Sequence, residues 1–374
     1  MTTYIKALAA CLLSIAMIGC TMQEQPTQSG LLRSNFQTEH AGKQTDLFTL
    51  TNANGMEVCF TNFGGRIVSI MVPDKTGNMQ DVCLGHDSIA DYIKYGYQGC
   101  NFGALIGRYG NRIGNSKFTL DGQEYQLIAN NNGNCLHGGG EVAFHNRMWD
   151  ANQVDDTKIE FTTVSPDGED GFPGEVSVKV TYTLTTDNAI EIAYEATTDK
   201  PTVLNLTNHC YFCLSGDPSK DMLDEVLYLN ANEYTPVDEN VAVTGEIATV
   251  EGTPFDFRVA KEIGKDINAD DKDLIIAGGY DHCLNFKGGA TETLDFAALN
   301  EAITAAETEL AKEGAYTSKS FNTLKLATDA GKNALTTAAT QKAVDHAVAT
   351  IYEAILSLEA LADISALTAE LAKY

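Results

Sequence analysis

The sequence predicts a mainly β protein: a large antiparallel β-sandwich over residues 44–289, followed by a small three-helix bundle over residues 290–374. Apolar residues alternate with polar ones from Val176 to Leu184 and from Ile190 to Tyr194, the period of a strand with one buried face. Thr185–Asn188 supplies turn residues between these two runs. Few segments of the first part keep a helical period, so we expect a sandwich of many short strands.

Other runs in the first part also have the composition of strands. They are Glu57–Phe60, Ile67–Val72, Lys117–Leu120 and Glu124–Leu127. Asp121–Gly122 between the last two is typical of a two-residue hairpin turn, so those strands should pair with each other.

The C-terminal part has helical periodicity. Apolar residues lie three or four positions apart at Phe296, Leu299, Ile303, Ala306 and Leu310, and again at Val348, Ile351, Ile355 and Leu358. Thr317 offers an N-cap before Phe321, and Thr340 offers one before Gln341. We therefore expect three antiparallel helices that bury one narrow seam. The glutamates of this part, including Glu301, Glu307, Glu309 and Glu353, are interpreted as solvated helix faces.

Composition limits the classes of partner. The chain has 374 residues, of which 25 are basic and 51 acidic, and its formal net charge of -26 would repel nucleic acid and anionic lipid. Partners should be neutral or cationic. Sugars meet that condition, although an acidic composition also serves simple solubility.

The first twenty residues have the pattern of an export signal. A weakly basic start, Met1–Lys6, precedes an apolar run from Ala7 to Ile18 that is too short to span a bilayer, and Gly19–Cys20 closes it. This resembles a bacterial lipoprotein signal over residues 1–19, with Cys20 carrying the lipid; an ordinary secretory signal is the alternative. We expect an exported protein, anchored to a membrane only through Cys20, and a solvated flexible tether over residues 20–43.

The nine cysteines show no regular framework of spacings. Most are interpreted as small buried apolar residues. Cys210 and Cys213 resemble a redox or zinc motif, but they lie on a strand-like run. Residues three apart on a strand point to opposite faces, so these two should share neither a disulfide nor a metal.

A glycine-rich stretch marks the candidate site. Residues 101–114 carry glycines at four positions together with Asn111 and Arg112, and His137 follows in Leu136–Gly139. Glycine lets backbone approach closely, while these polar groups suit a small polar ligand. The glycine spacing fits neither a dinucleotide fingerprint nor a phosphate loop. Sheet corners rich in glycine are the alternative interpretation.

A second candidate segment is the strand-like run of residues 203–213. Its apolar face would hold Leu204, Leu206, Cys210 and Phe212, and its polar face Asn205, Thr207 and His209. A polar row that ends in a histidine favours the floor of a site, although a lone histidine is often a core residue bonded to carbonyls. Further on, Asp281 stands at the start of another strand-like run.

These motifs together resemble the aldose 1-epimerase, or galactose mutarotase, family over residues 45–286. The motifs that carry the resemblance, in order, are Asn62–Gly65, Val72–Asp74, Asp81–Gly85, Gly107–Ile113, Leu136–Gly139, Trp149, Gly171–Gly174, Asn205–His209, Gly252–Asp256 and Tyr280–His282.

The resemblance implies an isomerase that interconverts the α and β anomers of a hexose such as galactose or glucose. A base takes the proton of the C1 hydroxyl and an acid protonates the ring oxygen, so the ring opens and recloses. By motif position His209 is the general acid, and His137 belongs to the same catalytic set. Asn111, Arg112, His137 and Asp281 would bind the sugar. The resemblance implies no cofactor and no metal, because only protons move.

The resemblance stops near residues 287–290. The family's later Gln-Pro-Gly segment and its general-base glutamate have no counterpart in this sequence, so the general base is unknown. The Ala-rich helices that follow resemble a FIVAR-type module, which implies a spacer or a surface for a partner or glycan. The alternative is therefore an inactive or weakly active sugar-binding remnant fused to a helical module. A glycosidase would need two carboxylates, and Asp281 alone does not suffice.

Overall fold

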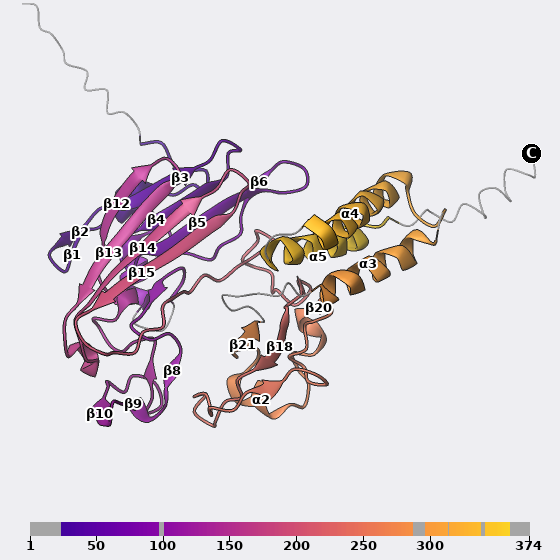
Figure 1. The fold of residues 1–374 in the computed structure, drawn as a ribbon. Coiled ribbons are helices and arrows are strands. Elements are labelled where there is room, and N and C mark those ends of the chain that lie inside the picture. Colours follow the sequence, from indigo (N-terminus) through magenta and orange to yellow (C-terminus); the bar gives the residue numbers. More distant parts are fainter. Residues whose placement is uncertain (1–23, 97–100, 287–295, 313, 338–340, 360–374) are drawn as a thin grey trace, which may run out of the picture.

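The computed structural model describes residues 24–96, 101–286, 296–312, 314–337 and 341–359, arranged as shown in Figure 1. The expected signal peptide, the expected lipid-bearing Cys20 and the expected N-cap Thr340 lie outside these ranges.

Two four-stranded antiparallel sheets form the larger part of the protein (Figure 1). The strands of the first sheet are, in order, β3 (Leu47–Thr51), β4 (Glu57–Thr61), β5 (Arg66–Pro73) and β6 (Met79–Asp81). Those of the second are β12 (Asp150–Asp155), β13 (Lys158–Ser165), β14 (Val176–Leu184) and β15 (Ile190–Thr198). Strand order equals chain order in both sheets, so each connection is a hairpin.

The predicted alternation is confirmed most clearly in β14. Its buried side chains are Val176, Val178, Val180, Tyr182 and Leu184, and none of the four residues between them is buried. β15 forms where the sequence predicts a strand, but its apolar residues are only partly covered. Tyr194 is 36% exposed, because β15 is the last strand of its sheet and one of its edges has no partner strand among the described residues.

One core lies between the two sheets and makes the predicted sandwich. Phe60 of β4 packs against Phe161 of β13 and Tyr182 of β14, with ring centroids 6.2 and 4.9 Å away. Trp149 is buried in the same core, and its indole N–H donates to the carbonyl of Phe144 at 3.0 Å. Burial of such aromatic side chains is the main source of the sandwich's stability.

The segment before the first sheet is packed, not flexible. Leu31 and Phe36 are buried, the latter in the short 3₁₀ helix η1 (Arg33–Phe36), and the backbone N–H of Gln28 donates to the carboxylate of Glu57 at 2.7 Å. The prediction of a tether over residues 20–43 is therefore wrong for residues 24–43. The segment is mostly polar, but Leu31 and Phe36 belong to a buried apolar cluster that includes residues of the first sheet.

The remaining short strands form sheets of two or three strands. They are β1 (Glu39–His40) with β2 (Lys43–Gln44), β7 (Leu105–Ile106) with β16 (Thr207–Asn208), β8 (Arg112–Ile113) with β11 (Cys135–Leu136), β9 (Lys117–Leu120) with β10 (Gln123–Gln126), β17 (Val226–Leu227) with β20 (Lys261–Glu262), and β18 (Ala231–Tyr234) with β19 (Ala248–Thr249) and β21 (Leu284–Phe286). Among them β18, β20 and β21 lie beside the helices, away from the two large sheets (Figure 1). The predicted hairpin is confirmed: β9 and β10 pair around Asp121 and Gly122, whose φ angles of 50° and 80° suit a two-residue turn.

The run at residues 203–213 is less regular than predicted. Its described strand is the two-residue β16, and two isolated bridges join Tyr109 with Asn205 and Cys83 with Phe212. Leu206 and Cys210 pack against the sandwich core as expected, but Leu204 and Phe212 are 38% and 55% exposed. Strict alternation of buried and exposed side chains therefore does not hold over the whole run.

The C-terminal helices form the predicted bundle. They are α3 (Ala297–Leu310), α4 (Ser318–Thr337) and α5 (Gln341–Leu356), whereas α1 (Ile89–Gly96) and α2 (Lys272–Ala277) belong to the β part. Leu299, Val348 and Ile351 are fully buried in the seam. Thr317 caps α4 by accepting the N–H of Ser320 at 3.4 Å. Within the described ranges, no helix has both the length and the apolar character that crossing a membrane requires.

Candidate active site

Glycines bring three distant segments together at the candidate site. Gly138 has a φ of +86°, and a Cβ on it would lie 2.0 Å from the carbonyl oxygen of Gly107. A Cβ on Gly110 would lie 3.2 Å from the side chain of Thr207. The expected close approach is thus between backbone segments, which places the glycine-rich stretch beside residues 136–139 and 205–209.

His137 and His209 contact each other at this junction. Their ring centroids are 5.0 Å apart with an interplanar angle of 85°. Nδ1 of His137 accepts the backbone N–H of Asn111 at 3.1 Å, so in the neutral ring the proton lies on Nε2. The backbone of His209 is held from both sides, because its N–H donates to Ala104 at 2.9 Å and its carbonyl accepts from Gly103 at 3.0 Å.

Arg112 and Asp281 lie in the same neighbourhood although they are far apart in the sequence. Their side chains are 3.8 Å apart, and Asn111 donates through Nδ2 to the sulfur of Cys283 at 3.3 Å. Only 13% of the Arg112 side chain is exposed, against 64% for Asp281. Nε of Arg112 donates to Asn131 at 3.0 Å, which fixes the plane of the guanidinium. The carboxylate of Asp281 therefore keeps acceptor positions open to solvent.

The electrostatic surroundings keep both histidines neutral. Burial is the largest cause that lowers the pKa of His137 to about 4, and the positive charges of Arg112 and of His209 in its protonated form act in the same direction. Burial also lowers the pKa of His209, and the negative charge of Asp281 partly opposes that shift. At pH 7 both rings can therefore donate through one nitrogen and accept through the other.

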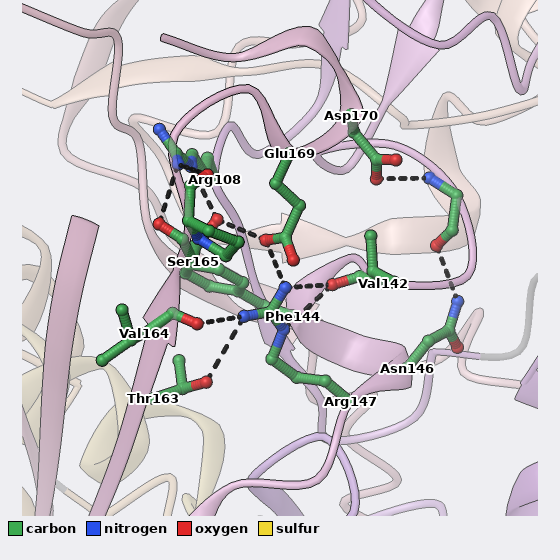
Figure 2. Close-up of polar contacts among 12 residues, drawn as sticks. Arg108, Val142, Phe144, Asn146, Arg147, Thr163, Val164, Ser165, Glu169 and Asp170 are labelled. Carbon is green, nitrogen blue, oxygen red and sulfur yellow. Dashed lines mark hydrogen bonds and ion pairs between the residues drawn. The ribbon is translucent and has the colours of Figure 1, made fainter. Parts of the chain in front are cut away.

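Two arginines, the buried Arg108 and the half-buried Arg147, hold neighbouring loops together (Figure 2). Arg108 is 2% exposed; it donates to Ser165 Oγ at 2.8 Å and to the carbonyl of Gly174 at 2.6 Å. Arg147 forms an ion pair with Glu169 and donates to the carbonyl of Val142 at 2.9 Å.

Asp170 then holds the glycine run that follows His137. Its carboxylate accepts the N–H of Gly140 at 3.0 Å (Figure 2), and a Cβ on Gly139 would lie 2.5 Å from the same carboxylate. These contacts fix the direction in which the loop leaves His137.

The sequence reasoning missed several supporting residues. Arg66 is fully buried, donates to the carbonyls of Phe102 and His145 at 3.0 and 2.7 Å, and lies over the ring of Tyr92. Arg66 directly follows the motif Asn62–Gly65, yet nothing in the sequence shows that its charge acts on His209. Tyr211, whose ring centroid is 5.1 Å from that of His209, was also missed.

Among the residues that the structure describes, neither the cysteines nor the acidic residues gather into a metal site. The described cysteines are all free thiols. Cys59, Cys83 and Cys135 are buried, Cys210 and Cys213 are half-buried, and Cys283 is exposed. Within the described ranges, no set of three or more histidine, cysteine, aspartate or glutamate side chains gathers as metal ligands would.

All five residues singled out from the sequence thus meet in one place. A β-sandwich that gathers two neutral imidazoles, a guanidinium, an amide and a solvent-facing carboxylate is typical of a site for a small, neutral, hydroxyl-rich ligand.

Comparisons with known proteins specify the family. The family model described as aldose 1-epimerase matches residues 46–348, and the chain belongs to that family.

Characterised relatives agree with this assignment. The chain is 41% identical over 243 residues to the aldose 1-epimerase of Escherichia coli K12, a match that covers 65% of this chain and 68% of that protein. It is also 41% identical over 234 residues to the galactose mutarotase of Bos taurus, covering 62% of this chain and 65% of the relative. About a third of each relative's length has no match in this chain.

Solved structures show the same fold. A galactose 1-epimerase from Lactobacillus acidophilus superposes with a TM-score of 0.60 at 30% identity, covering 68% of this chain and 73% of the other. An aldose epimerase homologue from C. elegans gives a TM-score of 0.59 at 31% identity, covering 66% and 73%. The family model's matched range extends past the last sequence motif into α3, α4 and α5, beyond the region where we noted the resemblance.

Proposed function

We propose that this chain is an aldose 1-epimerase that interconverts the α and β anomers of a hexose such as galactose or glucose. The observation that carries the proposal is the contact between His137 and His209 beside the Arg112–Asp281 pair. Family membership and the printed activities of the relatives support it.

In this mechanism His209 acts as general acid and protonates the ring oxygen of the sugar. Its fixed backbone and its contact with the His137 ring hold the imidazole in one orientation. Arg112 and His137 donate to sugar hydroxyls and to the oxygen that gains negative charge as the ring opens, and Asn111 adds an amide. Asp281 accepts bonds from hydroxyls. Only protons move, so the proposed chemistry needs no cofactor.

The general base is the unassigned part of the proposal, because the sequence has no counterpart of the family's base glutamate. A specific second candidate function follows: a sugar-binding protein with weak or no catalysis.

We also propose, from the sequence alone, that the chain is exported and lipid-anchored at Cys20, and that the helical bundle acts as a spacer or partner surface. Fractionating cells that carry a Cys20→Ser variant tests the anchor.

Polarimetry tests the proposed activity. We would follow the optical rotation of freshly dissolved α-D-galactose with the wild type, His209→Ala and, as matched control, His346→Ala, whose side chain is exposed on α5. We expect the wild type and the control to accelerate mutarotation equally. His209→Ala should lose a factor on the order of 10²–10⁴, the usual contribution of a general acid.

Two other outcomes would change the assignment. Equal rates for the wild type and His209→Ala would remove His209 from its proposed role. If a folded wild type does not exceed the buffer rate but binds galactose in a calorimetric titration, and Arg112→Ala does not bind, the sugar-binding alternative holds. Native fluorescence of Trp149, which is the single tryptophan of the chain, reports that the sandwich is folded.

A further inference from the structure

Two thiols from distant parts of the chain lie next to each other behind the candidate site. The sulfur atoms of Cys83 and Cys210 are 3.7 Å apart. Cys83 follows the first sheet directly after β6, and Cys210 follows His209. Neither residue has a part in the proposed epimerase chemistry, and both pack in the core cluster of the sandwich.

The backbone around both residues is already paired. Leu84 donates its N–H to the carbonyl of Tyr211, and Cys213 donates its N–H to the carbonyl of Val82, each at 2.9 Å. Cys83 and Phe212 face each other as an isolated antiparallel bridge. The two segments therefore cannot drift apart without breaking these bonds. A disulfide has an S–S length of about 2.05 Å, so the sulfurs at 3.7 Å need to approach by only about 1.7 Å, within reach of side-chain rotation.

We propose that Cys83 and Cys210 are the site of a disulfide cross-link that joins the segment carrying His209 to the first sheet. The bond closes a long loop of the chain, which restricts the unfolded state more than a short loop would. It also prevents residues 209–213 from separating from residues 82–84. The inference rests on the thiol geometry alone and does not depend on the proposed activity.

An external disulfide such as oxidised glutathione is the oxidant. The Cys210 thiolate attacks one sulfur of that disulfide and releases one thiol, leaving a mixed disulfide on Cys210. The sulfur of Cys83 then attacks Sγ of Cys210 and releases the second thiol. Two protons and two electrons leave the cysteine pair, and the external disulfide is reduced to two thiols.

The surroundings favour this order of steps. Cys210 is half-buried whereas Cys83 is buried, so Cys210 is the more accessible thiol. The hydrogen bond with Cys210, followed by burial, raises the pKa of the Cys83 thiol, which makes Cys83 the poorer first nucleophile. Cys83 and Cys213 both line a cavity of about 190 Å³, so Cys213 is the competing partner that an experiment must distinguish.

Peptide mapping tests the proposal on the purified full chain. The protein would be equilibrated with oxidised glutathione, blocked with N-ethylmaleimide and digested without reduction. Chymotrypsin cleaves after Tyr211 and Phe212, which separates Cys210 from Cys213. We expect one linked pair of peptides that contains Cys83 and Cys210. We also expect a melting temperature about 5–10 °C higher for the oxidised than for the reduced protein.

Variants provide the controls. Cys83→Ser and Cys210→Ser should each abolish the linked peptide and the temperature shift, whereas Cys59→Ser, which removes another buried thiol, should keep both. The proposal is overturned if both thiols are recovered blocked with N-ethylmaleimide while Trp149 fluorescence is native. It is equally overturned if the linked peptides join Cys83 to Cys213.

Discussion

At the scale of single residues, buried charge decides how the site can ionise. Arg66 is fully buried against carbonyls and the rings of Phe63 and Tyr92, and burial lowers its pKa to about 10, so it still carries its charge at pH 7. That charge adds to burial in lowering the pKa of His145 to about 3. A fixed cation among histidines thus favours their neutral forms.

A pH dependence of stability follows from these neutral histidines. The folded pKa of His137 is lowered to about 4 and that of His145 to about 3, whereas an unfolded histidine titrates near 6.5. Below pH 6.5 the unfolded chain binds protons that the folded chain does not, so the free energy of unfolding falls as the pH drops. The contribution of the neutral histidines to the free energy of unfolding is fully present above pH 6.5. By about pH 4 the protonation of His137 in the unfolded chain has lowered that free energy by an amount on the order of 3 kcal/mol.

Urea unfolding at pH 7.5, 5.5 and 4.5, followed by Trp149 fluorescence, measures this slope. We expect His145→Gln to flatten it by up to about 1.4 kcal/mol per pH unit in the window from about pH 6.5 down. His346→Gln, which changes an exposed histidine of α5, should leave the slope unchanged. An identical slope for wild type and His145→Gln would show that His145 is not buried in its neutral form.

At the scale of elements, the sequence predicts what local chemistry determines. The alternation of β14 and the Asp121–Gly122 turn are local signals, and both structures form as predicted. Local sequence patterns do not predict burial correctly where it depends on which other segments pack against the residue. The polar composition of the segment before β3 predicts a tether, but the side chain of Phe36 is fully buried in an apolar cluster with residues of the first sheet. β15 has a core-like pattern, yet its place at the sheet edge leaves Tyr194 exposed.

The candidate site shows the same division. The glycines and His137 of residues 107–139 and His209 of residues 205–209 could be identified from the sequence as candidates, and the structure brings these segments together. The contact between His137 and His209 could not be predicted, because it depends on how Gly138 passes over Gly107. The role of Arg108 could not be predicted either, because its guanidinium donates to carbonyls of two segments far along the chain, at Ser165 and at Pro173–Gly174.

A substitution at Gly138 tests that crossing of loops. Gly138→Ala adds a Cβ 2.0 Å from the Gly107 carbonyl at a φ of +86°, so the loops must separate. We expect a loss of more than about 3 kcal/mol in the free energy of unfolding, together with loss of mutarotation.

Gly133→Ala is the matched control for this clash. Gly133 has nearly the same φ, +81°, but a Cβ there meets nothing within 4 Å. It should cost only the backbone strain of about 1–2 kcal/mol. Equal losses in denaturant unfolding for the two variants would show that the close approach of Gly138 to Gly107 has no energetic weight.

At the scale of the whole molecule, the protein has two separate kinds of core. Phe60, Phe161 and Trp149 belong to the sandwich cluster, and Leu299, Val348 and Ile351 belong to the helical cluster. The two clusters share no residue. Tyr228 reaches the helices from the β part, with its ring centroid 6.1 Å from that of Tyr352. The separation of the two clusters favours two cooperative units that unfold separately.

A buried charge in the helical seam tests this independence. Val348→Asp places a carboxylate at a fully buried position of α5, which costs several kcal/mol unless the helices open. We expect the circular dichroism signal of the helices at 222 nm to melt at a much lower temperature. Trp149 fluorescence should melt at an unchanged temperature, because the single tryptophan of the chain lies in the sandwich core.

Leu326→Asp is the matched control, because Leu326 of α4 is 72% exposed and a charge there stays in water. It should change neither transition. If Val348→Asp lowers the Trp149 transition as much as the helical one, the bundle and the sandwich form a single cooperative unit. Tyr352→Ala then tests whether the contact between Tyr228 and Tyr352 carries part of that coupling, because its loss should move the two transitions apart.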